Sequence, residues 1–476
     1  MINLHLLYPE MVLAVMALGL IIAELFVAAK HSRILYHLAV LAAIIVLCLV
    51  GFTLSNPGQY QGLGTLWSVD PLSQFFKLLV LLATVLCLFL ALDYKELPPK
   101  HAGIFLCLLL LSSCGMMFLV SSVDLLLTFI ALELISISSF ILTGFERRNK
   151  KSTEGAVKYF LFGAFSSGVM AYGISLFYGF TGGTRLIGLA HTGGPLFILA
   201  ILLILLGFAF KASIAPMHFW VPDAYEGAPI PVTAFLSLAP KIATLGAMLR
   251  LFSVLLPASV LDLTALFALL ATLTMTIGNF TAFFQNNVKR LLAYSSIAQA
   301  GYMLIGIVSG NTLGLEGILL YSFIYVGMNI GAFAVAQAVG SENSRPDSDP
   351  YALESFNGLA RRSLGTALAM SFFLLSLSGI PPLAGFIGKF YIFSSAMQAG
   401  HYLLAAAGVI NSVVSVYYYM RIVYHMFFKA AQTQAALPIG PYLFGSLAIA
   451  TIAVIFFGIY PEPLIAGVKA SAQYLP

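Results

Sequence analysis

Long apolar runs separated by short polar segments recur about fourteen times along the 476 residues of the chain. Each run is near or above the ~20 residues that an α-helix needs to cross ~30 Å of hydrocarbon. The runs are continuous rather than alternating, which excludes a transmembrane β-barrel. The pattern predicts an all-α polytopic membrane protein with about 14 transmembrane helices. The predicted spans are 5–27, 34–54, 71–92, 103–121, 123–143, 155–179, 196–220, 231–256, 259–284, 289–309, 314–339, 364–398, 400–428 and 438–459.

The composition agrees with a membrane protein. Hydrophobic residues make up 60% of the chain and charged residues 9%, whereas soluble domains carry about 25% charged residues. This excludes a soluble globule of this size, and it also excludes disorder, which needs low hydrophobicity and high charge. The net charge of +5 is scattered over single loops. Because no basic stripe exists to neutralise a phosphate backbone, a nucleic-acid partner is excluded as well.

The basic residues lie in alternate loops. Odd-numbered loops carry nearly all of them, and even-numbered loops contain only Arg185. By the positive-inside rule, this asymmetry predicts a multi-pass protein of the inner (plasma) membrane with both termini on the outer face. The basic residues of the odd-numbered loops are Lys30, Arg33, Lys95, Lys100, Arg147, Arg148, Lys150, Lys151, Lys289, Arg290, Arg345, Arg361, Arg362 and Lys429.

Prolines interrupt three of the runs close to membrane depth. A proline has no N–H, so the carbonyl four residues earlier loses its helical partner. Irregular backbone is tolerated inside a membrane only where protein or water satisfies it. We therefore expect a polar pocket at each interruption. The affected carbonyls are those of Ala212 (from Pro216), Leu236 (from Pro240), and Leu377 and Ser378 (from Pro381 and Pro382).

Two of these interrupted runs, 196–220 and 364–398, occupy corresponding places in the chain, because one further helix follows each of them. Such pairs are typical of transporters built from repeats. The pattern predicts two five-helix inverted repeats, each with a proline-broken helix. The predicted units are an N-terminal three-helix segment (1–102), a first repeat of helices 4–8 (103–256), a second repeat of helices 9–13 (257–430) and the C-terminal helix 14 (431–476).

Among the charged residues of the predicted spans, the four that we place at membrane depth are Glu133, Lys211, Lys241 and Lys389. A charge at the bilayer centre costs ~2.5–3.5 kcal/mol on insertion scales, and such residues are usually functional. The structural alternative is a set of static ion pairs between helices. Glu133 could pair with one lysine, but two lysines would then remain without an acidic partner.

The chain shows no redox or metal chemistry of its own. Its cysteines, Cys48, Cys87, Cys107 and Cys114, lie inside apolar runs and form neither a CxxC motif nor a cluster with histidine, so we expect all four to be packing residues. No glycine-rich dinucleotide loop is present either. We expect no cofactor on this chain, and any electron transfer must occur on other chains.

Three motifs resemble one family. The stretch FKASIAPMHFWVPDAYEGAPIPVTAFLSLAPK (Phe210–Lys241), NVKRLLAYSSIAQAGY (Asn287–Tyr302) and GIPPLAGFIGKFYIF (Gly379–Phe393) are similar to the antiporter-like membrane subunits of complex I, the proton-pumping NADH:quinone oxidoreductase. The length and helix count are most like those of its subunit N. The resemblance implies a proton translocase subunit that works with other membrane and peripheral subunits, which would hold NAD, FMN, iron–sulfur clusters and quinone.

The resemblance also implies roles for individual residues. Glu133 matches the family's helix 5 glutamate, which pairs with a helix 7 lysine, here Lys211. Lys241 matches the central lysine of helix 8, and Lys389 the lysine of broken helix 12. His218 matches a histidine that bridges the first two lysines, and imidazole is a natural proton relay. Together these residues would form a proton relay at the midplane of the membrane.

Other polar residues leave two interpretations open. Ser136 could hydrogen-bond Glu133 or simply pack, and Asp223 and Glu226 could orient their loop or form a proton exit. Glu154 and Lys158 are spaced as a stabilising helical pair, and Arg250 and Arg421 are expected to extend towards the interface. Five residues of the second motif could line a water path or form interhelical hydrogen bonds: Tyr294, Ser295, Ser296, Gln299 and Tyr302.

Two other functions remain open from the sequence. The chain could belong to a multi-subunit Na⁺/H⁺ antiporter, although a sodium site would prefer oxygen ligands to lysines. It could also be a non-pumping structural subunit of the same complex. Neutral substitutions of Lys241 that leave coupling intact would favour the structural interpretation.

Overall fold

The computed structural model describes residues 7–55, 66–186, 194–258, 263–342, 349–431, 437 and 439–472, with only the backbone for 256–258. Arg345, one of the loop charges discussed above, lies outside these residues. The described α-helices are α1 Tyr8–Phe26, α2 Arg33–Ser55, α3 Pro71–Asp93, α4 Ala102–Ser121, α5 Leu125–Thr143, α6 Lys150–Thr181, α7 Pro195–Ala212, α8 Val221–Gly227, α9 Ile230–Ala258, α10 Thr264–Ala282, α11 Val288–Ser309, α12 Thr312–Glu342, α13 Leu359–Arg362, α14 Leu364–Ser378, α15 Ala384–Gln398, α16 Tyr402–Phe428, α17 Pro441–Ile459 and α18 Glu462–Ala472.

Thirteen helices in the described part of the chain are long and apolar enough to cross a membrane. They correspond to thirteen of the predicted runs. The remaining run, 364–398, forms two helices of 15 residues each, α14 and α15, on either side of the two prolines. The all-α polytopic membrane fold is thereby confirmed. The side of the membrane on which the termini lie stays a prediction.

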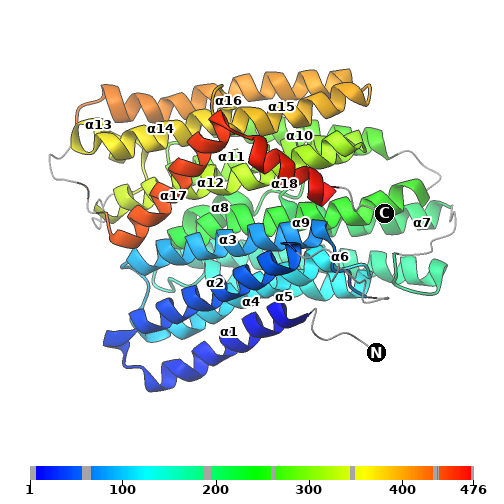
Figure 1. Cartoon of the computed structure of the whole chain (residues 1–476), viewed down its shortest axis with the longest axis horizontal. Helices are drawn as coiled ribbons and strands as arrows, with labels where there is room; N and C mark the ends of the chain where they lie inside the picture. Colours follow the sequence, from blue (N-terminus) through cyan, green and yellow to red (C-terminus); the bar gives the residue numbers. More distant parts are fainter. Residues whose placement is uncertain are drawn as a thin grey trace.

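The long helices run side by side, as Figure 1 shows, with α1 and α2 at one edge of the molecule and α15 and α16 at the other. Among the membrane-spanning helices, α9, α11 and α12 are almost completely buried, whereas fewer than a third of the residues in the spans of α1, α2, α6 and α17 are buried. An inner helix meets protein on all sides, and an outer helix meets lipid on one side. Both environments are apolar, which explains why the sequence shows continuous runs rather than amphipathic stripes.

Polar residues fix the starts of several helices. Asp70 accepts a hydrogen bond from the Ser73 N–H at 2.8 Å, and Ser73 Oγ accepts one from the Asp70 N–H at 3.1 Å, which forms a capping box before α3. Asp124 caps α5 through the N–H groups of Leu126 and Leu127. Such caps satisfy N–H groups that have no partner within the helix. They explain why α3 and α5 each begin directly after an aspartate.

The first break separates α7 from α8. Helix α7 ends at Ala212, and Ser213 adopts a left-handed conformation with φ of 62°. The Ile214 N–H then donates to the Ala209 carbonyl at 2.8 Å, and the Ser213 N–H donates to the Phe210 carbonyl at 3.1 Å, which is a Schellman cap. The predicted break is present, but the helix ends before Pro216 because this cap closes it first.

The second break, between α14 and α15, has the same cap. Gly379 is left-handed with φ of 83°, the Ile380 N–H donates to the Leu375 carbonyl at 3.1 Å, and the Gly379 N–H donates to the Ser376 carbonyl at 2.9 Å. Glycine adopts this conformation without the steric cost that a side chain would add. The two broken helices therefore end in the same way. That they belong to inverted repeats, with the unit boundaries given above, stays a prediction.

The cysteines are free thiols. Cys87, Cys107 and Cys114 are buried, as expected for packing residues, but Cys48 is exposed on α2. The expectation for Cys48 was therefore wrong, because α2 lies at the edge of the molecule and directs part of its apolar surface outward.

Candidate functional site

Three lysines are almost completely buried, each beside a helix break or a proline. Lys211 is the second-last residue of α7, Lys241 follows Pro240 within α9, and Lys389 lies in α15. They are 2%, 0% and 2% exposed. Lysines are almost never this buried without polar partners. The partners of each amine therefore indicate what it can do.

Lys211 is held by hydroxyl groups from two other helices. Its Nζ lies 3.2 Å from Ser136 Oγ of α5 and 3.0 Å from the Tyr159 hydroxyl of α6. Tyr159 stacks on Trp220 with ring centroids 3.8 Å apart, and Trp220 Nε1 donates to the Phe210 carbonyl at 3.1 Å. Aromatic residues around the break thus position the tyrosine that binds the amine.

Glu133 does not contact Lys211 in this structure. The carboxylate is half-buried and accepts a hydrogen bond from Ser167 of α6. Ser136, one turn further along α5, takes the place beside Lys211 that the family resemblance implied for Glu133. Residues three apart lie on the same face of a helix, so Glu133 and Ser136 face the same region of the break.

His218 lies in the segment between α7 and α8. It is 5% exposed, and its ring stacks on that of Phe219 with centroids 4.6 Å apart. Its Nδ1 is buried and has no hydrogen-bond partner among the described residues. A neutral imidazole carries one donor and one acceptor nitrogen, so this ring has capacity for one further hydrogen bond.

Lys241 has one hydrogen-bond partner among the described residues. Its Nζ donates to Ser296 Oγ of α11 at 2.7 Å, and the Tyr225 ring lies 5.6 Å away. The Leu236 carbonyl, which Pro240 was predicted to free, accepts a hydrogen bond from the Tyr225 hydroxyl at 2.9 Å. The carbonyl that Pro240 frees is therefore present as predicted, and the Tyr225 hydroxyl replaces its missing N–H donor.

Lys389 binds the backbone that the double proline frees. Its Nζ lies 2.8 Å from the Leu377 carbonyl, 3.3 Å from the Ser378 carbonyl and 2.9 Å from Ser412 Oγ. The predicted freed carbonyls are present at this break, and the lysine itself is their donor. An apolar pocket of about 860 Å³ between α15 and α16 reaches the same amine. The Tyr302 ring lies 4.2 Å from Nζ.

Helix α11 connects the surroundings of two lysines. Ser296 binds Lys241, and Gln299 Nε2 donates at 3.2 Å to the Leu377 carbonyl, which also binds Lys389. The other polar residues of this helix follow the same principle. Ser295 contacts Tyr419 of α16, Tyr302 accepts a hydrogen bond from Asn279 of α10, and Tyr294 is half-buried. Ser295, Ser296, Gln299 and Tyr302 thus form hydrogen bonds to other helices. Whether any of the five residues lines a water path stays a prediction.

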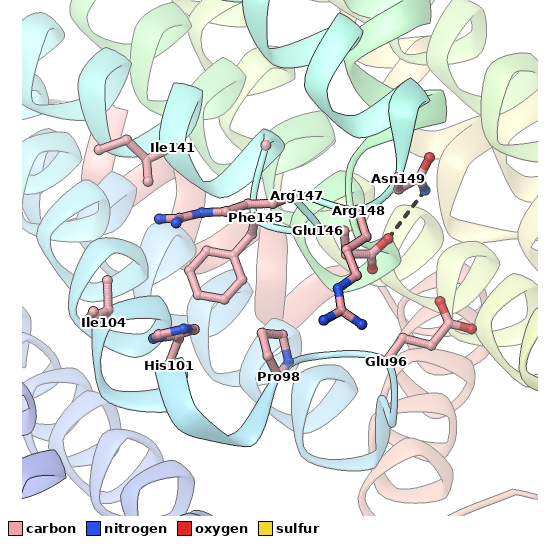
Figure 2. Close-up of a pocket in the computed structure, with 11 residues that line it drawn as sticks. Glu96, Pro98, His101, Ile104, Ile141, Phe145, Glu146, Arg147, Arg148 and Asn149 are labelled. Atoms are coloured by element: carbon pink, nitrogen blue, oxygen red, sulfur yellow. Dashed lines mark hydrogen bonds between the residues drawn. The ribbon is translucent and has the colours of Figure 1, made fainter.

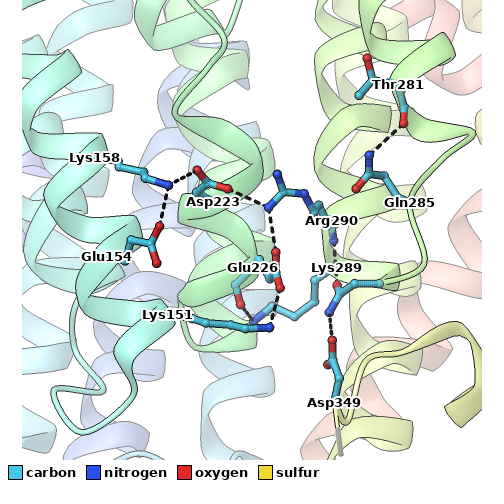
Figure 3. Close-up of polar contacts among 11 residues, drawn as sticks. Lys151, Glu154, Lys158, Asp223, Glu226, Thr281, Gln285, Lys289, Arg290 and Asp349 are labelled. Atoms are coloured by element: carbon cyan, nitrogen blue, oxygen red, sulfur yellow. Dashed lines mark hydrogen bonds and ion pairs between the residues drawn. The ribbon is translucent and has the colours of Figure 1, made fainter.

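A chain of ion pairs joins α6, α8 and α11 at their basic-loop ends (Figure 3). Asp223 pairs with Lys158 and Arg290, each at 2.7 Å, and Glu226 pairs with Arg290 at 2.8 Å and Lys151 at 2.7 Å. Burial opposes the ionisation of both carboxyls, but the hydrogen bonds from these cations outweigh it and lower the pKa of each carboxyl. The contacts support the interpretation that these acids orient α8.

The expected helical pair of Glu154 and Lys158 is present at 2.6 Å. Arg250 differs from the prediction. It is 5% exposed and pairs with Asp70 at 2.7 Å, because this partner lies within reach once the helices pack. Arg421 binds the Phe283 carbonyl and Asn286 but is only half-buried, so its extension towards the interface stays a prediction.

Sequence reasoning missed a buried ion pair between α1 and α3. Glu10 Oε1 lies 2.7 Å from Lys77 Nζ, and the two side chains are 0% and 1% exposed. The Lys77 amine also lies 5.5 Å from the Trp67 ring. The signal was available, because Lys77 interrupts an apolar run just as Lys211 does. Unlike the three lysines above, it has a carboxylate partner.

Residues 122–415 match the family model described as NADH:quinone oxidoreductase/Mrp antiporter, transmembrane. The chain is 43% identical over 447 residues to NADH-quinone oxidoreductase subunit N of Trichlorobacter lovleyi. The matched region covers 91% of this chain and 89% of the relative. It is 41% identical over 473 residues to the protein of that name from Moorella thermoacetica, covering 98% and 97%.

Solved structures agree with these relatives. A chain of respiratory complex I from Thermus thermophilus superposes with a TM-score of 0.83 at 33% identity, covering 97% of this chain and 99% of that one. A chain of the Mrp complex from Dietzia superposes with a TM-score of 0.83 at 20% identity, covering 98% and 97%, which shows the fold alone. The chain therefore belongs to the antiporter-like membrane subunits of NADH:quinone oxidoreductase, in the group named subunit N.

Proposed function

We propose that this chain moves protons across the inner (plasma) membrane through a midplane relay of Glu133, Lys211, His218, Lys241 and Lys389. Quinone reduction in other subunits would drive the relay, and those subunits would hold NAD, FMN, iron–sulfur clusters and quinone. Both termini would lie on the outer face. Each charge moved costs about 2.3 kcal/mol per 100 mV, which the electron transfer must supply.

The observation that carries this proposal is the nature of the lysine partners. Lys211, Lys241 and Lys389 bind hydroxyl or carbonyl oxygens, with no carboxylate in contact among the described residues. Hydroxyl groups rotate and both donate and accept, so an amine beside them keeps a partner in either protonation state. A carboxylate contact would hold the charge permanently. The Glu10–Lys77 and Asp70–Arg250 pairs are of that permanent kind.

The acceptors differ in number along the proposed relay. Ser412 Oγ donates to the Ser378 carbonyl at 2.7 Å, so it must accept from Lys389, which thus faces three acceptors. An ammonium group has three donors, so this site suits a proton at rest. Within the described part of the chain, Lys241 faces one acceptor, Ser296 Oγ. This hydroxyl donates its own proton to the Ala293 carbonyl at 2.7 Å, so it accepts from Lys241. We infer that Lys241 releases a proton more readily and Lys389 retains one.

Lys241 offers the clearest test in the intact membrane complex. Arginine keeps a positive charge but is not deprotonated in proteins. If Lys241 relays protons, both Lys241→Ala and Lys241→Arg abolish proton pumping and slow quinone reduction, while Lys429→Ala, at an exposed position, keeps both. If Lys241→Arg pumps at the wild-type rate, the residue supplies only a fixed charge and the relay is refuted. Wild-type pumping by Lys241→Ala would favour a structural subunit.

The sodium antiporter alternative is addressed by the same assay. The groups of the proposed relay are mainly amines, which repel a sodium ion when charged and which are poor ligands for it compared with oxygen. Proton pumping by the complex in sodium-free buffer, at the rate seen with sodium, is the expected result. A strict requirement for sodium would instead favour antiport.

A further inference from the structure

A pocket of about 680 Å³ opens at the basic-loop end of the molecule, between the α3–α4 loop and the α5–α6 loop (Figure 2). Its wall is partly apolar, and its rim carries charges of both signs. The charged and titratable side chains that line it are Glu96, His101, Glu146, Arg147 and Arg148. This pocket lies apart from the buried lysines described above, and the proposed relay does not use it.

One tyrosine hydroxyl bridges the two carboxyl groups of this pocket. The Tyr94 hydroxyl oxygen lies 2.7 Å from Glu96 Oε2 and 2.9 Å from Glu146 Oε1. A phenol has a single O–H, so it donates to only one of the two carboxylates. Tyr94 is 7% exposed, and its oxygen also accepts. Both short contacts are hydrogen bonds only if one carboxyl group carries a proton and donates it to the tyrosine.

The surroundings identify Glu146 as the protonated partner. Burial raises the pKa of Glu146, and this effect exceeds the opposing influence of Tyr94, Lys289 and Asn149. Glu96 is exposed to solvent, where a carboxylate is well hydrated. Of the two carboxyl groups, Glu146 is therefore the one that holds the shared proton more readily and donates it to Tyr94, while Glu96 accepts from Tyr94.

Groups on two neighbouring segments act on this bridge. Lys289 of α11 acts on Glu146, and Tyr351, whose ring lies 4.8 Å from the Lys289 amine, acts on Tyr94 and is itself acted on by Asp349. Lys289 Nζ donates to the carbonyls of Glu226 at 2.9 Å and Ala228 at 2.6 Å. Lys289 is 3% exposed and has no carboxylate within ion-pair distance among the described residues. The charge on Glu146 therefore changes the field at a buried ammonium group.

We propose that Glu96, Tyr94 and Glu146 form a proton-collecting site on the basic-loop face of the chain. Once Glu146 has released its proton towards the relay, Glu96 takes a proton from water and transfers it to the Tyr94 oxygen, while Tyr94 passes its own hydroxyl proton to the ionised Glu146. One O–H bond breaks on Glu96 and one on Tyr94, and one forms on Tyr94 and one on Glu146, so the tyrosine is neutral before and after. The proton then lies on Glu146, whose charge acts on the Lys289 amine. This proposal rests on the proposed proton translocation, which such a site would supply.

The protonated carboxyl group gives a test that does not depend on pumping. Infrared difference spectra of the intact complex in membranes, taken between neutral and alkaline pH, should show a carboxylic C=O band that Glu146→Gln removes. Glu154→Gln is the matched control, because Glu154 is a 62% exposed carboxylate near the same face, and it should leave the band in place. An identical band in Glu146→Gln would overturn the proposal.

Pumping measured against pH tests the collecting role. With Glu146→Gln or Tyr94→Phe, pumping should equal that of the wild type at low pH and fall at high pH, where protons are scarce. The alkaline midpoint should move down by about one pH unit, because rate follows the protonated fraction of the collecting group. A profile that superposes on the wild type overturns the proposal even if the infrared band is lost. Whether the relay itself fails is tested separately, by measuring proton pumping in Lys241→Arg.

Discussion

The buried ion pair between Glu10 and Lys77 makes a prediction about stability that follows from its geometry. At 2.7 Å and an effective dielectric constant of ~20, the attraction between the charges is about 6 kcal/mol. Removing both ions from water costs several kcal/mol each, so the net contribution of the pair is small. Removing one partner is different, because the other charge stays buried. Lys77→Met or Glu10→Leu should each cost ~3–5 kcal/mol.

The double variant separates the net contribution of the ion pair from the cost of leaving one buried charge without a partner. Glu10→Leu combined with Lys77→Met leaves no buried charge and fills similar volume, so it should recover most of the stability that either single change loses. The assay is the temperature at which this chain dissociates from the purified complex. Both single variants should dissociate at lower temperature than the wild type, and the double variant close to it. Single variants as stable as the wild type, or a double variant that loses the sum of both, would refute the reasoning.

Two further predictions concern helix contacts. Arg290→Gln should destabilise the chain by about 1 kcal/mol at pH 7, because the carboxyl partners of Arg290 are partly exposed. Folding lowers the pKa of each α8 carboxyl, so this stabilisation is present above the pKa values of the unfolded chain and is lost as pH falls through those of the folded chain. Thermal melts of the wild type and the variant should therefore converge below about pH 4. Gly385→Ala would place a Cβ 1.9 Å from the Ser376 carbonyl oxygen, whereas Gly365→Ala meets nothing within 4 Å. The first should reduce the amount of assembled complex seen on native gels, by an overpacking cost of ~1–3 kcal/mol, and the second should leave it unchanged.

The helices and their interruptions could be predicted from the sequence because they depend on local chemistry. Apolar runs long enough to span a membrane predict the membrane helices. A proline lacks an N–H in any surroundings, so it frees the carbonyl four residues earlier in a helix. This is why the freed carbonyls of Leu236, Leu377 and Ser378 could be named in advance. The end of α7 was placed less well, because the left-handed Ser213 closes the helix before Pro216. A non-glycine residue in that conformation leaves no sequence signal.

Partners across the fold were less predictable. Arg250 and Asp70 are 180 residues apart, and nothing local links them. Their pairing depends on how α9 packs near the start of α3. The same holds for Lys211, where Ser136 rather than Glu133 contacts the amine. Sequence identifies which residues need a partner, and packing decides which partner they meet.

The capped end of α14 has an electrostatic consequence for Lys389. The last carbonyls of a helix carry a partial negative charge equivalent to about half an electron, and two of them, those of Leu377 and Ser378, face the amine. A carboxylate in that place would accept the proton and neutralise both groups. A peptide carbonyl cannot take the proton in this way, so the break supplies a counter-charge that does not titrate. The Leu377 and Ser378 carbonyls thus stabilise a proton on Lys389 but cannot accept that proton from the amine.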